Sequence, residues 1–204
     1  MRWEIKEARI PSRSEIKALI RTLRERSDAA RINGNRQAVV DWMAVHALIG
    51  SGLRSHEIAA LQVGDLKVGY GEAALVVRKG KGGKSRVVAI SERLKHHLKQ
   101  YISWKKAQGE TIDTAAPLLR SERDGPYCTR GIRHLFKRCL KRAGISAAYG
   151  VHSLRHFHLS NLYEQTNDLR LVQDQAGHSS VAVTQVYTHV SLGRRQQAVE
   201  TIFS

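Results

Sequence analysis

Residues 176–189 read AGHSSVAVTQVYTH, with a histidine at position 178 and a tyrosine at position 187. From Val181 onward, apolar and hydroxyl side chains recur at every third position, which predicts an amphipathic helix. Gly177 can end a preceding helix, and the serines that follow it can cap the next one. His178 is therefore expected at a turn between two helices, and Tyr187 near the end of the second. A tyrosine on such a helix is usually a core residue, unless basic chemistry elsewhere converges on it.

The charge of the chain is strongly positive. Its 204 residues include 34 Lys and Arg against 18 Asp and Glu, a formal net charge of +16 at pH 7. This surplus favours a polyanionic partner, nucleic acid first. An anionic membrane would also attract it, but the sequence shows no basic amphipathic helix with a bulky aromatic face. With 42% hydrophobic residues, the chain can bury the core of one domain, with room for a small extra lobe.

Simple patterns exclude several classes of protein. No run of about 18 apolar residues predicts a membrane span, and residues 1–6 lack the apolar core of a secretory signal. Two cysteines, Cys128 and Cys139, do not make a disulfide framework, and the ten histidines show no metal-ligand spacing. We therefore expect a cytoplasmic protein that associates with nucleic acid.

The pattern of apolar residues predicts an α+β fold that is mainly helical, with a small antiparallel sheet. Ser12 and Glu15 form a capping box that opens the first helix, and the strongly apolar helix over 36–49 should be the buried one. Ser91, Thr129 and Asn167 or Asp168 can cap later helices. Helices are expected over 12–26, 36–49, 53–61, 92–106, 130–142, from 151 and over 169–176, and strands over 65–68, 73–78, 85–90 and 116–119.

An arginine follows two glycines at a predicted helix start. Gly50 and Gly52 end the apolar helix, and Arg54 lies at or near the N-terminus of the next one. Small residues permit close approach of a phosphate, and the unpaired N–H groups of a helix end attract it. The alternative is an ordinary surface arginine.

Basic residues also crowd the predicted hairpin and the helix over 130–142. Lysines at a hairpin tip commonly keep an edge strand soluble, but they can also reach into a DNA groove or deliver a proton. The helix carries more basic side chains than a solvated face needs. The residues expected to contact DNA are Lys79, Lys84, Arg86, Arg130, Arg133 and Lys137.

Six residues together supply what phosphoryl transfer without a metal requires: Arg54, Lys81, His152, Arg155, His178 and Tyr187. Two arginines can clamp the non-bridging oxygens of a phosphodiester as its charge grows. A tyrosine can attack the phosphorus, but with an ordinary pKa of about 10 it needs a base or a strong positive field. His152 or the arginines can supply these, and a lysine on a hairpin can protonate the leaving 5′ oxygen.

At four separated places the chain resembles the tyrosine recombinases, the phage-integrase family. Residues 52–57 (GLRSHE) are similar to the family's first arginine box, and residues 80–86 (GKGGKSR) to its hairpin lysine motif. Residues 152–156 (HSLRH) resemble its HxLRH box, and residues 177–178 its GH motif. Tyr187 then falls where the family's nucleophile belongs. Four motifs in the right order make the resemblance specific.

The resemblance implies a role for each residue of the site. Arg54 and Arg155 would clamp the phosphate, and Tyr187 would be the nucleophile. Lys81 would be the general acid toward the 5′ hydroxyl, with Lys79 and Lys84 as alternatives. His152 would be the general base or a further phosphate ligand, and His178 a hydrogen-bond donor to the phosphate. Glu57 would support the site, its plain alternative being a first-turn charge on the helix surface.

The resemblance also implies the organisation and partners of the protein. The whole chain, 1–204, would be one catalytic domain, with a lead-in over 1–11 and a tail over 191–204. Most family members carry an N-terminal core-binding domain that is expected to be absent here, either because this is a short natural member or because it is a truncated or excised catalytic domain. Its activity would be metal- and ATP-independent strand exchange on double-stranded DNA in the cytoplasm, through a 3′-phosphotyrosine. It would act as a homo-oligomer, a tetramer on DNA, with accessory DNA-bending proteins as possible partners.

Three other functions compete with this interpretation. A type IB topoisomerase uses similar chemistry, but relaxes one duplex rather than exchanging strands. A non-catalytic DNA-binding regulator derived from an integrase would have lost a catalytic residue, and none of the six is missing. A ribosomal or RNA-binding protein would explain the charge and leave the six-residue set unexplained.

Overall fold

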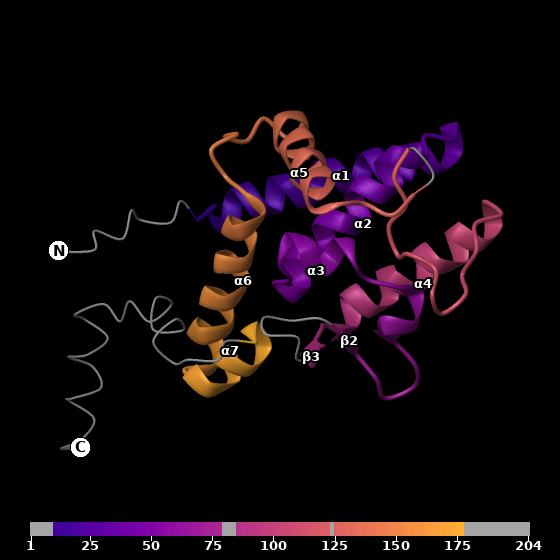
Figure 1. The fold of residues 1–204 in the computed structure, drawn as a ribbon. Helices are drawn as coiled ribbons and strands as arrows, with labels where there is room; N and C mark the ends of the chain where they lie inside the picture. Colours follow the sequence, from indigo (N-terminus) through magenta and orange to yellow (C-terminus); the bar gives the residue numbers. More distant parts are fainter. Residues whose placement is uncertain (1–9, 79–84, 123–124, 178–204) are drawn as a thin grey trace, which may run out of the picture.

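Helices make up most of the architecture, and a short antiparallel sheet lies beside them (Figure 1). The structure, a computed structural model, describes residues 10–78, 85–122 and 125–177. The helices are α1 (Arg13–Asn33), α2 (Arg36–Ser51), α3 (Ser55–Ala59), α4 (Glu92–Ala107), α5 (Thr129–Arg142), α6 (Val151–Thr166) and α7 (Leu169–Ala176), with a 3₁₀ turn η1 (Val63–Asp65). The strands are β1 (Leu66–Lys67), β2 (Ala74–Val77) and β3 (Arg86–Ala89). The expected mainly helical α+β fold is confirmed.

The centre of the core is α2. Its side chains Val40, Met43 and Val45 are fully buried. The helix packs against α1, α4, α5 and α6, so that it contacts most of the other helices. Because burial of apolar surface is the main favourable term in folding, this helix organises the domain, as the sequence predicts. Although α2 is apolar, neither it nor any other helix in the described part of the chain is long and apolar enough to cross a membrane.

The first helix, α1, begins where the sequence predicts and ends later. Ser12 Oγ accepts the backbone N–H of Glu15, and the Glu15 carboxylate accepts the backbone N–H of Ser12 at 2.8 Å, so the capping box is confirmed. The helix continues beyond its expected end because Ser27 and Ala30 pack into the interior. It stops at Gly34, which takes up the left-handed φ of 71° that favours glycine.

The three strands pair antiparallel in the order β1-β2-β3. Leu66 pairs with Leu75, and Val77 pairs with Arg86, which fixes the register. The predicted hairpin strands are therefore confirmed. The hairpin tip lies outside the described residues, and with it Lys79, Lys81 and Lys84.

The prediction of a strand over residues 116–119 is wrong. The described contact is an isolated bridge between Gln62 and Pro117, beside a hydrogen bond from the Leu118 N–H to the Leu61 carbonyl at 2.8 Å. Proline has no N–H to donate to a ladder, so the pairing does not extend into a strand.

The cap of α5 is Cys128 rather than Thr129, which is the first helical residue. The Cys128 sulfur accepts the Gly131 N–H at 3.4 Å. Both cysteines are free thiols, Cys128 exposed and Cys139 buried. Burial raises the pKa of the Cys139 thiol, which makes this thiol unreactive.

The last described helix, α7, has both of its expected ends. The Asp168 carboxylate accepts the N–H groups of Arg170 at 2.8 Å and Leu171 at 3.0 Å, which caps the helix start. Gly177 ends the helix with a φ of 63°. The helix expected from Val181 lies outside the described residues.

Candidate active site

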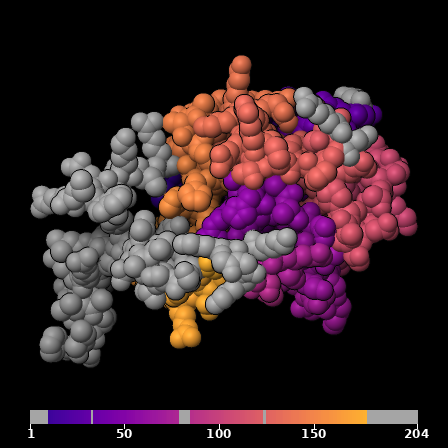
Figure 2. All heavy atoms as spheres, in the orientation of Figure 1, coloured from indigo at the N-terminus to yellow at the C-terminus, as the bar shows by residue number. Residues whose placement is uncertain are grey.

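The predicted site residues that the structure describes gather around α3. Arg54 is the N-cap of α3, and Glu57 lies in its first turn. Arg155 lies in α6, and Gly177 directly follows α7. Figure 1 shows α3 between α6 and the sheet, and Figure 2 shows the chain segment around α3 reaching the surface of this face. His178 and Tyr187, like the hairpin lysines, lie outside the described residues.

A buried carboxylate holds two arginines. Glu57 is 3% exposed and receives both terminal nitrogens of Arg86, at 2.7 and 2.9 Å. It also receives Arg54 Nη1 at 3.0 Å and the Arg54 backbone N–H at 2.8 Å. Three of these four bonds come from guanidinium nitrogens, and the bidentate pair fixes the orientation of Arg86 because charge-assisted bidentate pairs are directional. We refer to Arg54, Glu57, Arg86 and Arg155 as the Glu57 cluster.

The charge state of Glu57 follows from this contact set. Burial alone would raise its pKa, but the hydrogen bonds and positive charge of Arg86, with the backbone N–H of Arg54, outweigh burial. The pKa of Glu57 is lowered to about 2, so the carboxylate is ionised at neutral pH. Arg86, which the sequence assigns to DNA contact, is thus placed as the partner of Glu57, and its side chain is 12% exposed.

Arg155 joins the ends of two helices. Its Nη1 donates to the Gly52 carbonyl and its Nη2 to the Ala176 carbonyl, both at 2.7 Å. Gly52 follows α2, and Ala176 is the last residue of α7. Helix C-termini carry unsatisfied carbonyls and partial negative charge, so a buried guanidinium is well placed there. Arg155 is 2% exposed.

The Ala176 carbonyl also receives Arg54 Nη1, at 3.5 Å. Two arginines that are far apart in the sequence therefore meet directly before the Gly177-His178 motif. Gly177 itself lies against Arg86, since a Cβ at this position would come within 2.5 Å of the Arg86 Cδ. With a φ of 63° as well, this position requires glycine.

A glutamine in α7 fastens this helix to the sheet. The Gln175 side-chain amide donates to the Ala89 carbonyl at 2.9 Å and accepts the Ala89 N–H at 3.1 Å. Its nitrogen also lies 3.2 Å from His158 Nε2, while His158 Nδ1 bonds to the Ile49 carbonyl at 3.0 Å. Sequence reasoning missed Gln175, because no motif or spacing marks a glutamine that pairs with a distant strand edge.

His152 is exposed beside the Glu57 cluster, one helical turn before Arg155. Partial desolvation lowers its pKa, and the positive charges of Arg155 and Arg54 lower it further. The imidazole is therefore neutral near pH 7 and can accept a proton. His152 also shares a hollow of about 390 Å³ with Arg133 and Lys137 of α5. The structure thus brings two predicted DNA contacts next to a predicted catalytic residue.

The basic residues of α5 separate into two groups. Arg130, Arg133 and Lys137 are exposed, and Lys137 Nζ bonds to the carbonyls of Ala147 and, at 2.7 Å, Tyr149. On the other side of the helix, Arg138 and Arg142 reach the carboxylate of Asp41, at 2.7 and 2.6 Å. Asp41 is 1% exposed, so this second group joins α5 to the core.

Guanidinium groups held in this way are typical of sites that bind and polarise an oxyanion such as a phosphate ester. Guanidinium groups fixed in advance are suited to charge that grows in a transition state. Beside them, His152 has a lowered pKa, so its imidazole is neutral near pH 7 and can accept a proton. Within the described ranges, no three or more His, Cys, Asp or Glu side chains are placed to hold a metal ion.

The chain belongs to the phage integrase family, whose sequence profile matches residues 12–194. The resemblance to tyrosine recombinases is confirmed. Tyrosine recombinase XerC of Halalkalibacterium halodurans is 32% identical over 158 residues, which cover 76% of this chain and 51% of that protein. The chain thus spans about half the length of curated relatives that it matches.

Solved structures share the fold. The crystal structure of XerA recombinase has a TM-score of 0.74 and 27% identity, and the match covers 94% of this chain and 64% of that chain. XerH recombinase bound to its difH substrate, in a pre-cleavage complex, has a TM-score of 0.73 and 22% identity over 93% of this chain and 53% of that one.

Proposed function

We propose that this chain carries the strand-transfer chemistry of a site-specific tyrosine recombinase, which cuts and rejoins DNA. One observation carries the proposal: Arg54 and Arg155 both donate to the Ala176 carbonyl, next to Gly177-His178. Three motifs that are distant in the sequence meet at this point. Family membership over residues 12–194 supports the same activity, and we propose that these residues form its catalytic domain.

The proposed reaction is a transesterification at phosphorus. The Tyr187 oxygen bonds to phosphorus while the bond to the 5′ oxygen breaks, which leaves a 3′-phosphotyrosine and a 5′ hydroxyl. Arg54 and Arg155 contact the non-bridging oxygens, and His178 donates a hydrogen bond to them. His152 takes the phenol proton or assists the arginines, and Lys81 protonates the 5′ oxygen.

Rejoining reverses these steps with the 5′ hydroxyl of a partner strand. The phosphoester bond energy is kept in the phosphotyrosine, so the proposed cycle needs neither ATP nor a metal. We propose a homo-oligomer, a tetramer on DNA, because exchange needs two duplexes. Accessory DNA-bending proteins are further proposed partners.

Double-stranded DNA is the proposed partner of the basic surface. The net charge of +16 suits a polyanion, and Arg130, Arg133 and Lys137 are exposed on α5, where Arg133 and Lys137 share a hollow with His152. Lys79 and Lys84 would add hairpin contacts. Because phosphate contacts release counterions, binding should weaken as salt rises.

The second candidate function is relaxation of one duplex, as a type IB topoisomerase does with similar arginine and histidine chemistry. It shares the cleavage step and lacks exchange with a second duplex. A strand-exchange assay with two labelled duplexes separates the two, since only a recombinase yields a joint product.

The test of the cleavage step is covalent trapping. The protein is mixed with a nicked duplex carrying sites from its own genomic neighbourhood, in a buffer with a chelator, and run on a denaturing gel. A protein–DNA band that is absent for Tyr187→Phe establishes the tyrosine transferase. An adduct that persists in Tyr187→Phe would reject the nucleophile assignment.

The acid assignment has its own test. Lys81→Ala should slow cleavage of the ordinary substrate, and much less so a substrate with sulfur at the 5′ bridging position, because a thiolate leaves without a proton. Equal slowing on both substrates would move the acid role to Lys79 or Lys84.

A further inference from the structure

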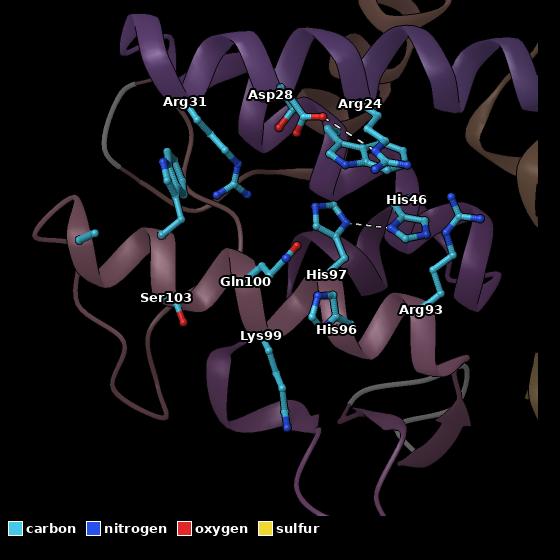
Figure 3. Close-up of a pocket in the computed structure, with 14 residues that line it drawn as sticks. Arg24, Asp28, Arg31, His46, Arg93, His96, His97, Lys99, Gln100 and Ser103 are labelled. Atoms are coloured by element: carbon cyan, nitrogen blue, oxygen red, sulfur yellow. Dashed lines mark hydrogen bonds and ion pairs between the residues drawn. The ribbon is translucent and has the colours of Figure 1, made fainter.

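A second group of cationic side chains surrounds a pocket between α1, α2 and α4, with a volume of about 920 Å³. None of its lining residues belongs to α3, α6 or α7, so it is separate from the Glu57 cluster. We call it the α1–α4 pocket (Figure 3). Its lining includes Arg24, Arg31, Arg93 and Lys99, and Asp28 is the one carboxylate among the described residues that line it.

The positive charge of this pocket is poorly compensated. Arg24 reaches Asp28 at 3.8 Å, and both side chains are mostly exposed. Arg31 and Arg93 form no ion pair with any described residue. Lys99 extends away from His97, whereas Arg31 and Arg93 lie on the same side of α4 as His97, at the two ends of the histidine pair (Figure 3). A hollow lined by one sign of charge concentrates counter-ions of the other sign.

The floor of the pocket contains buried polar atoms that lack partners. His46 and His97 share a hydrogen bond between their Nδ1 atoms at 2.8 Å, and both rings stack on Trp42. His97 is 7% exposed, and its Nε2 has no hydrogen-bond partner in the described part of the chain. Ser27 is 1% exposed, and its hydroxyl has none either. Such atoms are costly to bury and are usually satisfied.

The histidine pair can turn a donor toward the pocket. One proton lies between the two Nδ1 atoms, and either ring can hold it. When His46 holds it, His97 carries its own proton on Nε2 and becomes a donor at the unpartnered position. An anion in the pocket would favour this tautomer. The anion would then meet donors from α1 and α4.

We propose that the α1–α4 pocket binds a phosphate group, with Ser27 Oγ and His97 Nε2 as hydrogen-bond donors, Arg31 as the cationic ligand on the His97 side, and Arg93 adding positive charge from the His46 side. A dianionic phosphate suits this excess of guanidinium groups better than a single carboxylate does. The phosphate can come from a free phosphate ester or from the backbone of a nucleic acid.

The test is calorimetric titration of the full chain with inorganic pyrophosphate at low salt. The double variant Arg31→Gln, Arg93→Gln should bind at least about tenfold more weakly, whereas Arg26→Gln, an exposed arginine on α1 outside the pocket, should bind as the wild type does. Both substituted arginines are exposed, so the fold is retained and circular dichroism verifies it. Any pyrophosphate that binds at the Glu57 cluster also binds in the double variant, so this signal is subtracted from the wild-type titration.

Two outcomes overturn the proposal: no saturable pyrophosphate binding, or equal affinity for pyrophosphate in the wild type and the double variant. A protein that binds polyglutamate but not pyrophosphate also overturns it, because the pocket would then select carboxylates. A second titration assigns the source. If DNA supplies the phosphate, the slope of log K against log salt for an unrelated duplex should fall by about one to two in the double variant. An unchanged slope with lost pyrophosphate binding assigns a free phosphate ester. Neither result depends on Tyr187 or on strand transfer.

Discussion

The Glu57 cluster and the α1–α4 pocket each gather three arginines, yet the arginines are held differently. In the cluster, two arginines share the carboxylate of Glu57, and the third is held by two helix-end carbonyls. In the pocket, Arg31 and Arg93 have no ion-pair partner among the described residues, and they lie beside a histidine pair. The arginines of the cluster are therefore held in position without a ligand, whereas we expect a ligand to position the arginines of the pocket.

This difference suits the cluster to the proposed catalysis and the pocket to the proposed binding of an anion. Preorganised groups need no rearrangement when charge develops, so they stabilise a transition state more effectively than mobile groups do. Unpaired cations contribute little to stability and gain energy only when an anion enters. Substitutions in the cluster should therefore reduce the free energy of unfolding, whereas substitutions of the pocket arginines should leave it nearly unchanged.

The largest expected effect on stability comes from Glu57→Gln. Removing the carboxylate leaves Arg86 and Arg54 largely buried without a counter-charge, which should cost about 3 to 4 kcal/mol. The control is Asp28→Asn, because Asp28 pairs with Arg24 at the surface and the two side chains are 64% and 62% exposed. Urea unfolding should show a change below about 0.5 kcal/mol for the control. Similar losses in both variants would mean that the cluster is not preorganised by its carboxylate.

The histidine pair of the pocket and Glu57 of the cluster should lose their contributions to the free energy of unfolding in different pH ranges. Burial lowers the pKa of His46 to about 4 and, with the neighbouring charges, that of His97 to about 3, against 6.5 for a free histidine. The unfolded chain therefore binds protons first, and stability falls as the pH drops from about 6.5 toward 4. The pKa of Glu57 is about 2 in the folded protein, against 4.5 for a free glutamate. Its contribution to the free energy of unfolding therefore persists down to pH 4.5 and disappears toward pH 2. The shift of His46 or of Glu57 corresponds to about 3 kcal/mol.

Urea midpoints measured from pH 7 to pH 3 check this order. The variant His46→Gln, His97→Gln should flatten the curve between pH 6.5 and 4.5, and Glu57→Gln should flatten it only below pH 4.5. His158, whose pKa burial lowers to about 4, retains part of the upper slope in both variants. A flattening of the upper window by Glu57→Gln would contradict the assignment.

A smaller effect is expected for Gly177→Ala. Its new Cβ meets Arg86 at 2.5 Å in addition to the left-handed backbone, so we expect a loss of about 2 to 3 kcal/mol. Gly144→Ala is the matched control, with a φ of 66° and no neighbour within 4 Å, and should cost about 1 kcal/mol. Thermal unfolding gives the difference, which reports the contact alone. Equal losses would show that Arg86 moves aside without cost.

The smallest expected effect is that of Arg31→Gln. Because this arginine has no ion-pair partner among the described residues and is exposed, its loss should change stability by less than about 0.5 kcal/mol. Thermal unfolding at low salt measures it, where any repulsion within the pocket is strongest. A decrease of more than about 1 kcal/mol in the free energy of unfolding would show that Arg31 stabilises the fold in the absence of a ligand.

The sequence predicts what depends on local signals. Ser12, Ser91 and Asp168 lie at helix starts because their side chains accept the N–H groups of the first turn, a contact within three residues. The buried helix 36–49 and the hairpin strands follow from the spacing of apolar residues. The position of Arg54 at a helix start follows from the glycines before it.

Long-range polar contacts are what the sequence does not reveal. Asp41 pairs with two arginines of α5, and Lys105, fully buried, bonds to Glu110 at 2.7 Å and to the Pro117 and Leu118 carbonyls. No periodicity marks a pairing between distant helices or loops. The same holds for Arg86, whose partner Glu57 could be identified only once α3 and β3 were placed together.

The most direct test of the account is the rate of adduct formation by Arg54→Ala on two nicked duplexes, one with an ordinary scissile phosphate and one with a neutral methylphosphonate. Arg54 is suitable because Glu57 keeps both bonds from Arg86 when it is removed. If the cluster neutralises phosphate charge, the variant should lose about a hundredfold or more on phosphate and far less on methylphosphonate. An equal loss on both substrates would contradict the account, because Arg54 would then act only by holding α3 in place.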